Sequence, residues 1–391
     1  MFKYFAIHIV RVLLHVFYIF PINKKKILLS SFSGKRYFCN PKYIFIDLYE
    51  KKPELKYIWC LNQNELELPK DQNNIIIVKC YTLLWMYHIL TSKVIITNVA
   101  LWTFLPYRKN QIIINTWHGG GAYKKVGFAD TSDRSKKFWH KKTYDKFRSL
   151  TSQSFSYFIS SSKAFSRVMH DSYDIPYDKY LPIGMPRNDI FFKDNSELMR
   201  LLKNKLGISM DTSIVLYAPT HRGGMEYSLE TMDKLIDNLD IEKLKKTLEE
   251  KFKKKYIFMF RGHPNYNNNL FCKNAIDISS YNDMQELLII TDVLITDYSS
   301  CVWDFSLTMK PCFLFVPDID IYLLHDKGLY TSIYSWPYPV AKTNEELCSN
   351  IADFNQEECN ARIKKHHEDL GSYEKGTATS QVTQLLLRVF D

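Results

Sequence analysis

Four short polar segments of this sequence hold residue types that bind phosphate or move a proton. They are WHGGG (117–121), THRGG (220–224), RGHP (261–264) and DYSS (297–300), and each follows a run rich in β-branched or aromatic residues. Arginine binds phosphate oxygens through its forked guanidinium group, and histidine accepts a proton near neutral pH. Serine hydroxyls and backbone N–H groups at a helix start also bind phosphate. Each segment by itself is also typical of an ordinary turn, but the four together favour phosphate binding and transfer.

The WHGGG segment is the centre of this prediction. Ile112–Thr116 is expected to form a buried strand, and His118 follows its carboxyl end, where ligands bind in open α/β sheets. The glycines that begin at Gly119 allow the backbone to turn and to approach a ligand closely. Lys124 and Lys125 come next, and we expect them to contact an anion.

The composition of the whole chain limits the classes of protein that fit. A length of 391 residues predicts two or three domains, and 46% hydrophobic with 24% charged residues predicts a globular protein. The net charge of +10 indicates acidic partners such as nucleic acid, anionic lipid or phosphorylated substrates. The eight cysteines form no C-x-x-C pair and no Cys/His metal spacing, which favours reduced thiols in the cytoplasm over structural zinc. We expect no metal site and no cofactor, since fixed cationic and N–H donors can neutralise phosphate charge without Mg²⁺, and a metal-assisted reaction is the alternative. The lack of a Walker A pattern argues against a P-loop kinase.

The first 20 residues have the spacing of an amphipathic helix. Its apolar face holds Phe2, Phe5, Ala6, Ile9, Val10, Leu13, Leu14 and Phe17, and the opposite face holds Tyr4, His8, Arg11 and His15. The run is short for a bilayer span, contains an arginine and precedes no small-residue cleavage site. Because the first 46 residues carry eight Lys or Arg and no acid, we expect residues 1–22 to associate with an anionic membrane surface. The alternative is a helix that packs on the protein.

Strand-like runs alternate with helical segments in both halves of the chain, which is the signature of parallel sheets built from βαβ units. Strands are predicted at Ile27–Ser31, Tyr57–Leu61, Ile75–Val78, Val94–Asn98, Ile112–Thr116, Tyr157–Ser161, Tyr180–Ile183, Ile214–Ala218, Tyr256–Phe260, Val293–Thr296 and Cys312–Val316. The predicted fold is α/β, with two Rossmann-type doubly wound domains facing across a cleft. We expect an acceptor-side domain over residues 23–207 and a donor-binding domain over residues 208–391.

A basic segment, Arg134–Arg148, holds seven Lys or Arg interleaved with four aromatic residues. Such a pattern suits nucleic acid or a phosphate-rich interface equally well, and a solvated helix face is the alternative.

The chain resembles the CDP-glycerol glycerophosphotransferase family, which comprises teichoic-acid primases and polymerases with a GT-B fold. The resemblance extends from about Ile27 to Gly376–Ala378. It is carried by Trp117-His118-Gly119 with Lys124, Lys125 and Gly127, by GMPRND (184–189), by YAPT (217–220) with Arg222, by RGHP (261–264), and by TDVLITDYSS (291–300) with Asp304. Gly120 and Gly121 replace a threonine-proline pair that is common in the family, and THRGG replaces a frequent TWR.

The resemblance implies transfer of glycerol phosphate from CDP-glycerol to a hydroxyl of a membrane-linked teichoic-acid or capsule acceptor, with release of CMP. It implies that His118 is the general base and that His263 is a second catalytic residue, which holds the diphosphate with Arg261. The implied donor site consists of Thr220, Arg222, Arg261, Asp297, Ser299, Ser300 and Asp304. The implied acceptor or anion site consists of Gly119, Lys124, Lys125, Arg187 and Asn188. Asp297 and Asp304 either orient a neighbouring side chain or cap helices.

Three alternatives remain open at this stage. The chain could transfer ribitol phosphate from CDP-ribitol, or a sugar from a nucleotide sugar as a GT-B glycosyltransferase. It could also be a basic nucleic-acid- or membrane-binding module with a vestigial site. We favour the first reaction, at the cytoplasmic face of a bacterial cell membrane, with a CDP-activated polyol and a lipid-linked or polymer acceptor as partners and no nucleic acid.

Overall fold

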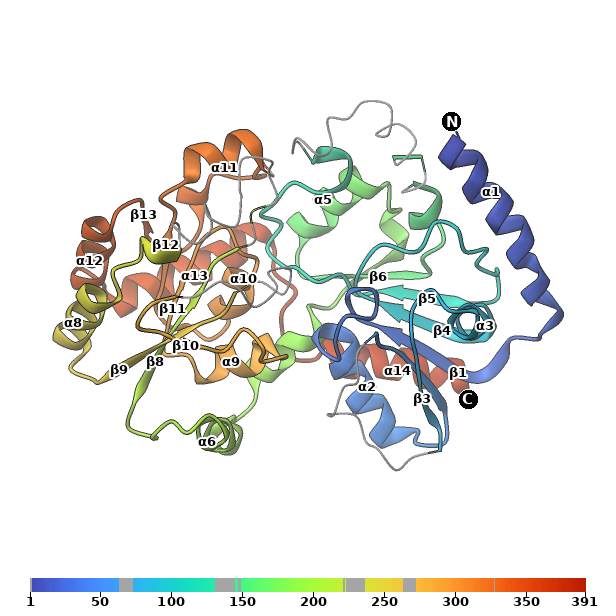
Figure 1. Cartoon of the computed structure of the whole chain (residues 1–391), viewed down its shortest axis with the longest axis horizontal. Coiled ribbons are helices and arrows are strands. Elements are labelled where there is room, and N and C mark those ends of the chain that lie inside the picture. Colours follow the sequence, from blue (N-terminus) through green and yellow to red (C-terminus); the bar gives the residue numbers. More distant parts are fainter. Residues whose placement is uncertain are drawn as a thin grey trace. The chain divides into compact units, whose positions relative to one another are not determined.

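The computed structural model of the chain describes residues 2–62, 73–130, 145–146, 149–220, 222, 236–262, 272–326 and 328–391. Its chain forms two compact units (Figure 1). Unit 1 comprises Met1–His118, Phe138–Asp189 and Tyr373–Asp391, and unit 2 comprises Gly119–Lys137 and Ile190–Ser372. The predicted basic segment at 134–148 lies outside the described residues except for Asp145 and Lys146.

Unit 1 is built on a parallel sheet whose strands have the order β3-β2-β1-β4-β5-β6-β7 in the described part of the chain. The strands are β1 (Asn23–Ser30), β2 (Lys56–Cys60), β3 (Ile75–Val78), β4 (Ser92–Thr97), β5 (Ile112–Asn115), β6 (Tyr157–Ser160) and β7 (Tyr180–Pro182). Its helices are α1 (Phe2–Leu14), α2 (Cys39–Lys51), α3 (Leu83–Thr91), α5 (Lys163–Tyr173) and α14 (Ala378–Phe390). The strand order reverses between β1 and β4, the kind of position where doubly wound sheets bind ligands.

Unit 2 repeats this plan with the strand order β10-β9-β8-β11-β12-β13 among its described residues. The strands are β8 (Ser213–Ala218), β9 (Tyr256–Phe260), β10 (Ile276–Asp277), β11 (Val293–Thr296), β12 (Cys312–Phe315) and β13 (Val340–Ala341). The helices are α6 (Ser196–Lys205), α8 (Ile241–Phe252), α9 (Met284–Ile290), α10 (Cys301–Ser306), α11 (Ile319–His325), α12 (Asn344–Ala352) and α13 (Gln356–Leu370). Here the order reverses between β8 and β11.

The central strands are buried along their whole length, because helices cover both faces of a parallel sheet. All six residues of β8 and all four of β11 and of β12 are buried. This burial explains why these strands are continuous apolar runs rather than alternating ones. The predicted α/β class with two doubly wound parallel sheets is therefore confirmed.

The division between the units differs from the predicted boundary at residues 207 and 208. The C-terminal helix α14 belongs to unit 1, where it packs against α2 (Figure 1). The segment that begins at Gly119 belongs to unit 2. Local periodicity could not show that these two segments join the other unit, since that assignment depends on contacts between residues far apart in the sequence.

The N-terminal segment forms α1 and continues as a short 3-10 helix, η1 (His15–Ile19). Arg11 of α1 turns toward the rest of unit 1 and donates a hydrogen bond of 3.2 Å from Nη1 to the carbonyl oxygen of Thr103. Within the described residues, no helix is long and apolar enough to cross a membrane.

Candidate active site

His118 lies just beyond the carboxyl end of β5, and its ring is held in one tautomer. The Nδ1 atom of His118 is 2.7 Å from the carbonyl oxygen of Asn98, which follows the end of β4. A carbonyl oxygen only accepts hydrogen bonds, so Nδ1 carries the proton and Nε2 is the basic nitrogen of the neutral ring. The ring also stacks with Trp117, with centroids 4.7 Å apart, and lies 4.8 Å from the ring of Phe32.

The backbone before His118 is strained, and Asn40 supports it. Trp117 is a buried non-glycine residue with φ of 49°, a conformation that is costly unless its surroundings hold it. The Nδ2 atom of Asn40, in the first turn of α2, donates to the carbonyl oxygens of Thr116 and Trp117 at 3.1 and 3.0 Å. Its Oδ1 atom accepts from the backbone N–H of Arg187 at 3.0 Å.

Sequence analysis missed Asn40 and Asn98, since neither belongs to a motif with residues of obvious chemistry. Asn98 is fully buried, and its Oδ1 atom accepts a 2.8 Å hydrogen bond from the backbone N–H of Phe32. Its Nδ2 group is buried without a hydrogen-bond partner among the described residues. The signal that was available is position: both asparagines occur at the carboxyl edge of the predicted sheet.

The GMPRND motif at 184–189 closes unit 1 by holding the returning C-terminal segment. Asp189 accepts hydrogen bonds from the backbone N–H groups of Ala378 and Thr379 at 3.1 and 2.7 Å, at the start of α14. Asn188 donates to Glu374 at 3.1 Å. Arg187 and Asn188 are buried, and Nη1 of Arg187 lies 3.1 Å from Sγ of Cys39. These contacts favour a positioning role for both residues over direct contact with an acceptor.

The glycines after His118 belong to unit 2 and lie against the start of α10. A Cβ atom on Gly119 would lie 3.4 Å from Cβ and Oγ of Ser300, in ordinary contact. A Cβ atom on Gly120 would lie 2.1 Å from Cδ1 of the buried Trp303, which no side chain can tolerate. Gly120 is therefore needed for close packing of this loop on α10.

The rest of the glycine-rich loop is anchored to unit 2 by Tyr123. The hydroxyl of Tyr123 is 2.9 Å from Nε2 of His366 on α13, and its ring stacks on Trp336. Lys124 pairs with Leu329 in an antiparallel bridge, and its ammonium lies 5.9 Å from the centre of the Tyr322 ring. The backbone N–H of Lys125 donates to the carbonyl oxygen of Gly328 at 2.8 Å.

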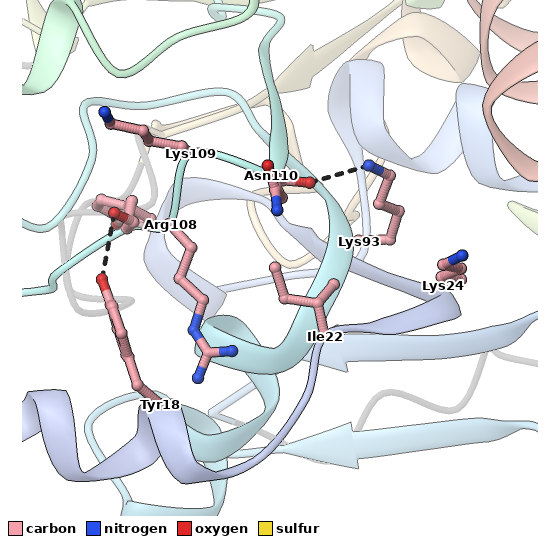
Figure 2. A pocket seen from close by; sticks show the side chains of 8 residues that line it. Tyr18, Ile22, Lys24, Lys93, Arg108, Lys109 and Asn110 are labelled. Carbon is pink, nitrogen blue, oxygen red and sulfur yellow. Dashed lines mark hydrogen bonds between the residues drawn. The ribbon is translucent and has the colours of Figure 1, made fainter.

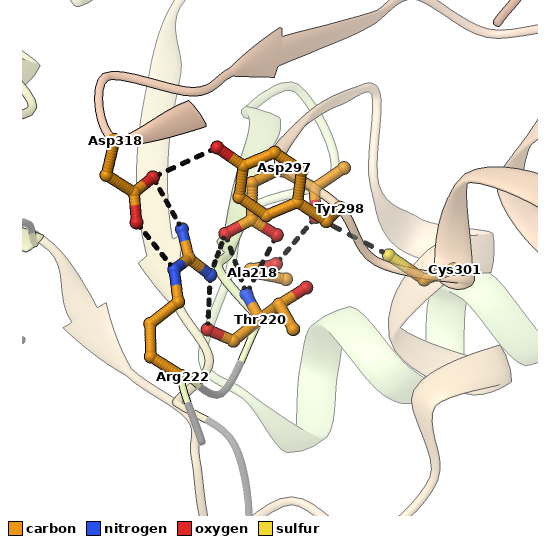
Figure 3. Close-up of polar contacts among 8 residues, drawn as sticks. Ala218, Thr220, Arg222, Asp297, Tyr298, Cys301 and Asp318 are labelled. Carbon is orange, nitrogen blue, oxygen red and sulfur yellow. Dashed lines mark hydrogen bonds and ion pairs between the residues drawn. The ribbon is translucent and has the colours of Figure 1, made fainter. Parts of the chain in front are cut away.

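Arg222 lies in a buried cluster with two carboxylates, close to the carboxyl ends of β8 and β11 (Figure 3). Its Nη1 atom is 2.7 Å from Asp297, and its Nε and Nη2 atoms are 2.8 and 3.1 Å from Asp318. Its guanidinium lies over Tyr298, whose hydroxyl donates to Asp318 at 3.1 Å. Burial opposes the charge on Arg222, but Asp297 and Asp318 outweigh that effect and raise the pKa of the guanidinium above its ordinary value.

Asp297 also orients the segment that follows β8. Both of its carboxylate oxygens accept from the backbone N–H of Thr220, at 2.9 and 3.0 Å. The hydroxyl of Thr220 is buried and has no hydrogen-bond partner within the part of the chain that the structure describes. A buried hydroxyl without a partner is costly, and a ligand oxygen at this position would satisfy it.

The serines after Asp297 begin α10. Oγ of Ser299 accepts from the backbone N–H of Cys301 at 3.3 Å, and Ser300 is the N-cap residue of α10. Because α10 has only six residues, its dipole is small. Any attraction for an anion here therefore comes mainly from hydroxyl and N–H groups.

Two of the remaining predicted donor residues, Arg261 and Asp304, lie in different environments. Arg261 follows β9, and its Nη2 atom donates to the carbonyl oxygens of Tyr281 and Asn282, both at 3.2 Å. Asp304 is buried in α10 and accepts from Nε2 of Gln285 at 3.1 Å. His263 lies outside the described residues.

The structure thus assembles two groups of residues, and each group lies within one unit. Unit 1 holds a histidine with a fixed tautomer, and unit 2 holds hydroxyl groups and a rigid Arg222 cluster at the reversal of strand order. No group of three or more metal-ligating side chains is present among the described residues. A doubly wound α/β fold with a histidine of fixed tautomer and with hydroxyl donors at the carboxyl edges of its sheets is suited to an enzyme that acts on phosphate groups.

Comparison with known proteins identifies the family. The CDP-glycerol:poly(glycerophosphate) glycerophosphotransferase family matches residues 12–388. The chain belongs to this family and is a glycerophosphotransferase, as the motifs predicted.

Individual relatives agree with this assignment. The chain is 30% identical, over 97% of its own length and 96% of the relative's, to a teichoic acid poly(glycerol phosphate) polymerase of Bacillus spizizenii. It is 26% identical to a teichoic acid poly(ribitol-phosphate) polymerase of the same organism, covering 91% of this chain. The chain spans 55% of the length of that protein, and 44% and 51% of the lengths of two further teichoic acid polymerases. A structure of the wall teichoic acid polymerase TagF matches all of this chain and 98% of its own, with a TM-score of 0.84 and 24% identity. TagF has also been soaked with CDPG.

Proposed function

We propose that the chain transfers glycerol phosphate from CDP-glycerol to a hydroxyl group of a membrane-linked teichoic-acid or capsule acceptor, with release of CMP. The observation that carries this proposal is the hydrogen bond from Nδ1 of His118 to the carbonyl oxygen of Asn98. It leaves Nε2 as the basic nitrogen, which suits removal of the proton from an acceptor hydroxyl.

In the proposed reaction the acceptor oxygen attacks the phosphorus that bears glycerol. The new P–O bond forms as the P–O bond to CMP breaks, and Nε2 of His118 takes the hydroxyl proton. Phosphoryl transfer depends mainly on alignment and on neutralising charge on the phosphate oxygens. His118 therefore supplies a modest part of the rate, and the donor site supplies the rest.

The donor site is proposed in unit 2, at the reversal of strand order between β8 and β11. The partnerless hydroxyl of Thr220 supports this location, since a diphosphate oxygen would satisfy it. We assign contacts with the donor to Thr220, Ser299 and Ser300, and we assign binding of the diphosphate to Arg261 and, from its motif alone, to His263. Arg222 and Asp297 act by holding Thr220, because their charges are already paired with each other.

The anion-binding part of the acceptor site is proposed to include Lys124 and Lys125, with Gly119 providing close backbone approach. Lys124 is supported by its position over the ring of Tyr322, which stacks on Tyr298 beside Arg222. A negatively charged teichoic-acid chain would be attracted by both lysines.

Association with the cytoplasmic face of the membrane is the second part of the proposal. Along α1 and η1, a stripe of apolar side chains at helical spacing is exposed, comprising Ile9, Val12, Leu13 and Val16. Val12 and Leu13 are 69% and 66% exposed, whereas the guanidinium of Arg11 turns inward. Exposed leucine and valine at this density favour insertion at the membrane surface.

The test of the reaction is CMP release from purified protein given CDP-glycerol and CDP-ribitol in parallel, with a glycerol-phosphate-primed lipid analogue as acceptor. We expect release with CDP-glycerol. Release with CDP-ribitol alone would instead assign ribitol-phosphate transfer, which the relative that polymerises ribitol phosphate makes the second candidate. Release of a nucleoside diphosphate from a nucleotide sugar, with neither CDP-polyol used, would contradict the proposal.

The test of membrane association uses flotation with vesicles of phosphatidylglycerol and phosphatidylcholine. Val12→Ser combined with Leu13→Ser should reduce the bound fraction several-fold, since each removes about 1 kcal/mol or more of apolar transfer free energy. Leu201→Ser combined with Met210→Ser is the control, because Leu201 and Met210 are exposed apolar residues too, at 52% and 50%, but lie in unit 2. Equal loss in both variants would contradict a role for α1.

A further inference from the structure

A cationic cavity lies at the amino edge of the unit 1 sheet, opposite to the edge that holds His118 (Figure 2). Its volume is about 760 Å³, which is ample for a phosphate ester with a small polyol. The lining comes from η1, the first residues of β1, the start of β4 and the loop before β5. Among the described residues, no predicted catalytic, donor or acceptor residue lines it.

In the part of the chain that the structure describes, the cavity is lined by four cationic side chains, Lys24, Lys93, Arg108 and Lys109, and by no carboxylate. Lys24 and Lys109 are solvent-exposed, and neither has an ion-pair partner among the described residues. The ammonium of Lys93 donates to the carbonyl oxygen of Asn110 at 2.9 Å. Four like charges around one concavity repel one another, and a bound anion would relieve that repulsion.

Arg108 is fixed at the wall of the cavity by the η1 segment. Its Nη1 and Nη2 atoms donate to the carbonyl oxygens of Phe20 and Phe17 at 2.8 and 2.6 Å. Its guanidinium lies 4.3 Å from the centre of the Tyr18 ring. Burial lowers the pKa of Arg108 from its ordinary value, which is the cost of a half-buried cation with no carboxylate beside it among the described residues.

Exposed apolar side chains adjoin this cationic cavity. Tyr18 and Ile22 line it, and the same segment exposes Val16, Ile19 and Phe20 to solvent, with Ile19 74% exposed. A ligand that fits both features has an anionic head and an apolar body. A free phosphate ion would leave the apolar side chains in water.

We propose that this cavity binds the phosphate headgroup of an anionic membrane phospholipid, with the acyl chains beside Val16, Ile19 and Phe20. The inference rests on the membrane association proposed above and names the lipid class that α1 and η1 recognise. Lys24 and Lys109 contact the phosphate, and Arg108 joins the headgroup site to the η1 segment.

Binding to vesicles of equal parts phosphatidylglycerol and phosphatidylcholine tests this site. Lys24→Gln combined with Lys109→Gln should weaken binding about tenfold, because the variant loses the attraction of two basic residues to the anionic surface. Lys25→Gln combined with Lys79→Gln is the matched control, because both lysines are exposed in unit 1 but lie outside the cavity lining. The control variant should bind the vesicles at least threefold more tightly than the cavity variant does. Equal weakening would show that total charge alone is responsible and would overturn the proposal.

Soluble ligands separate a lipid site from a free phosphate site. Dihexanoyl phosphatidylglycerol below its micelle concentration should bind the wild-type protein in calorimetry, and the cavity variant should lose most of that binding. Glycerol 3-phosphate should bind at least tenfold more weakly, and equal affinity for both ligands would overturn the lipid assignment. CMP release with a short soluble acceptor should be unchanged in the cavity variant, so failure of this inference is distinguishable from failure of the proposed reaction.

Discussion

The Nδ1 atom of His118 and the carbonyl oxygen of Asn98 are 2.7 Å apart and join the carboxyl ends of β5 and β4. This bond assigns the proton to Nδ1 and fixes the plane of the ring. A histidine held in this way loses little rotational freedom when it accepts a proton from a bound hydroxyl.

The first prediction concerns this histidine. His118→Gln should lower kcat for CMP release by about 10²–10⁴-fold, the usual contribution of a general base. Binding of CDP-glycerol, measured by calorimetry, should change little. His170→Gln is the control, because Nδ1 of His170 makes a similar 2.8 Å bond to the carbonyl oxygen of Ile175 away from the site. Weaker donor binding together with normal kcat would contradict the role as a base.

The second prediction concerns the buried Arg222 cluster. Arg222→Met leaves Asp297 and Asp318 without their cation, so the free energy of unfolding in urea should fall by about 3–5 kcal/mol. Donor affinity should fall as well, because Asp297 then holds Thr220 less firmly. Arg200→Met, which removes an exposed pair with Glu197, should change neither quantity. Stability equal to wild type in Arg222→Met would argue that Arg222 is not paired in solution.

The third prediction concerns Asn40. Asn40→Ala removes both N–H donors from the carbonyl oxygens of Thr116 and Trp117, so the strained Trp117 backbone should relax. We expect kcat to fall about tenfold, for a loss of about 1.4 kcal/mol, while KM for the donor stays nearly constant. Asn40→Asp keeps the acceptor for the Arg187 N–H group but loses both donors, so it should also lower kcat.

Asn195→Ala is the control for Asn40, since Asn195 also donates to two carbonyl oxygens but lies in unit 2. A normal kcat in Asn40→Asp would assign the effect to the Arg187 contact and not to Trp117.

The fourth prediction concerns acid stability. Burial lowers the pKa of His366 to about 4, so this ring is neutral in the folded protein at pH values where it is protonated in the unfolded chain. The unfolded state therefore binds more protons between about pH 4 and 6.5. Stability should be fully present above that window and should fall as pH decreases through it, by up to about 3 kcal/mol for this group.

His366→Gln should flatten that part of the profile of unfolding free energy against pH. His15→Gln, at an exposed histidine of η1, should leave the slope unchanged. Because His366 contacts Tyr123, the fluorescence of the adjacent Trp336 should report loosening of the glycine-rich loop over the same pH range. A slope unaffected by His366→Gln would rule out this histidine as the origin.

Much of the fold can be predicted from the sequence, because a fully buried strand appears as a short continuous run of apolar residues. The predicted strands at Ile75–Val78, Tyr256–Phe260 and Val293–Thr296 have the observed bounds. The two-residue strands β10 and β13 were not predicted, since two residues carry no periodicity. The place of α14 in unit 1 was not predicted either, because it depends on a hydrogen bond between Asp189 and Ala378, which are 189 positions apart.

The candidate site was predictable in its residue types but not in all its contacts. His118 and Thr220 lie at strand ends, as their place after apolar runs indicated. Arg222 was expected to bind phosphate, and it is instead enclosed by Asp297 and Asp318. Charge alone could not reveal those partners, because they lie 75 and 96 positions away in the sequence.

The cationic cavity and His118 lie at opposite edges of one sheet, and β4 connects the two edges: Lys93 is near its start, and Asn98 follows its end. Six residues at about 3.3 Å each make this strand about 20 Å long. A lipid headgroup held at the amino edge would therefore place the membrane a strand length from the base. Under both proposals, the length of β4 would set how far an acceptor has to extend from the bilayer before its terminal hydroxyl reaches His118.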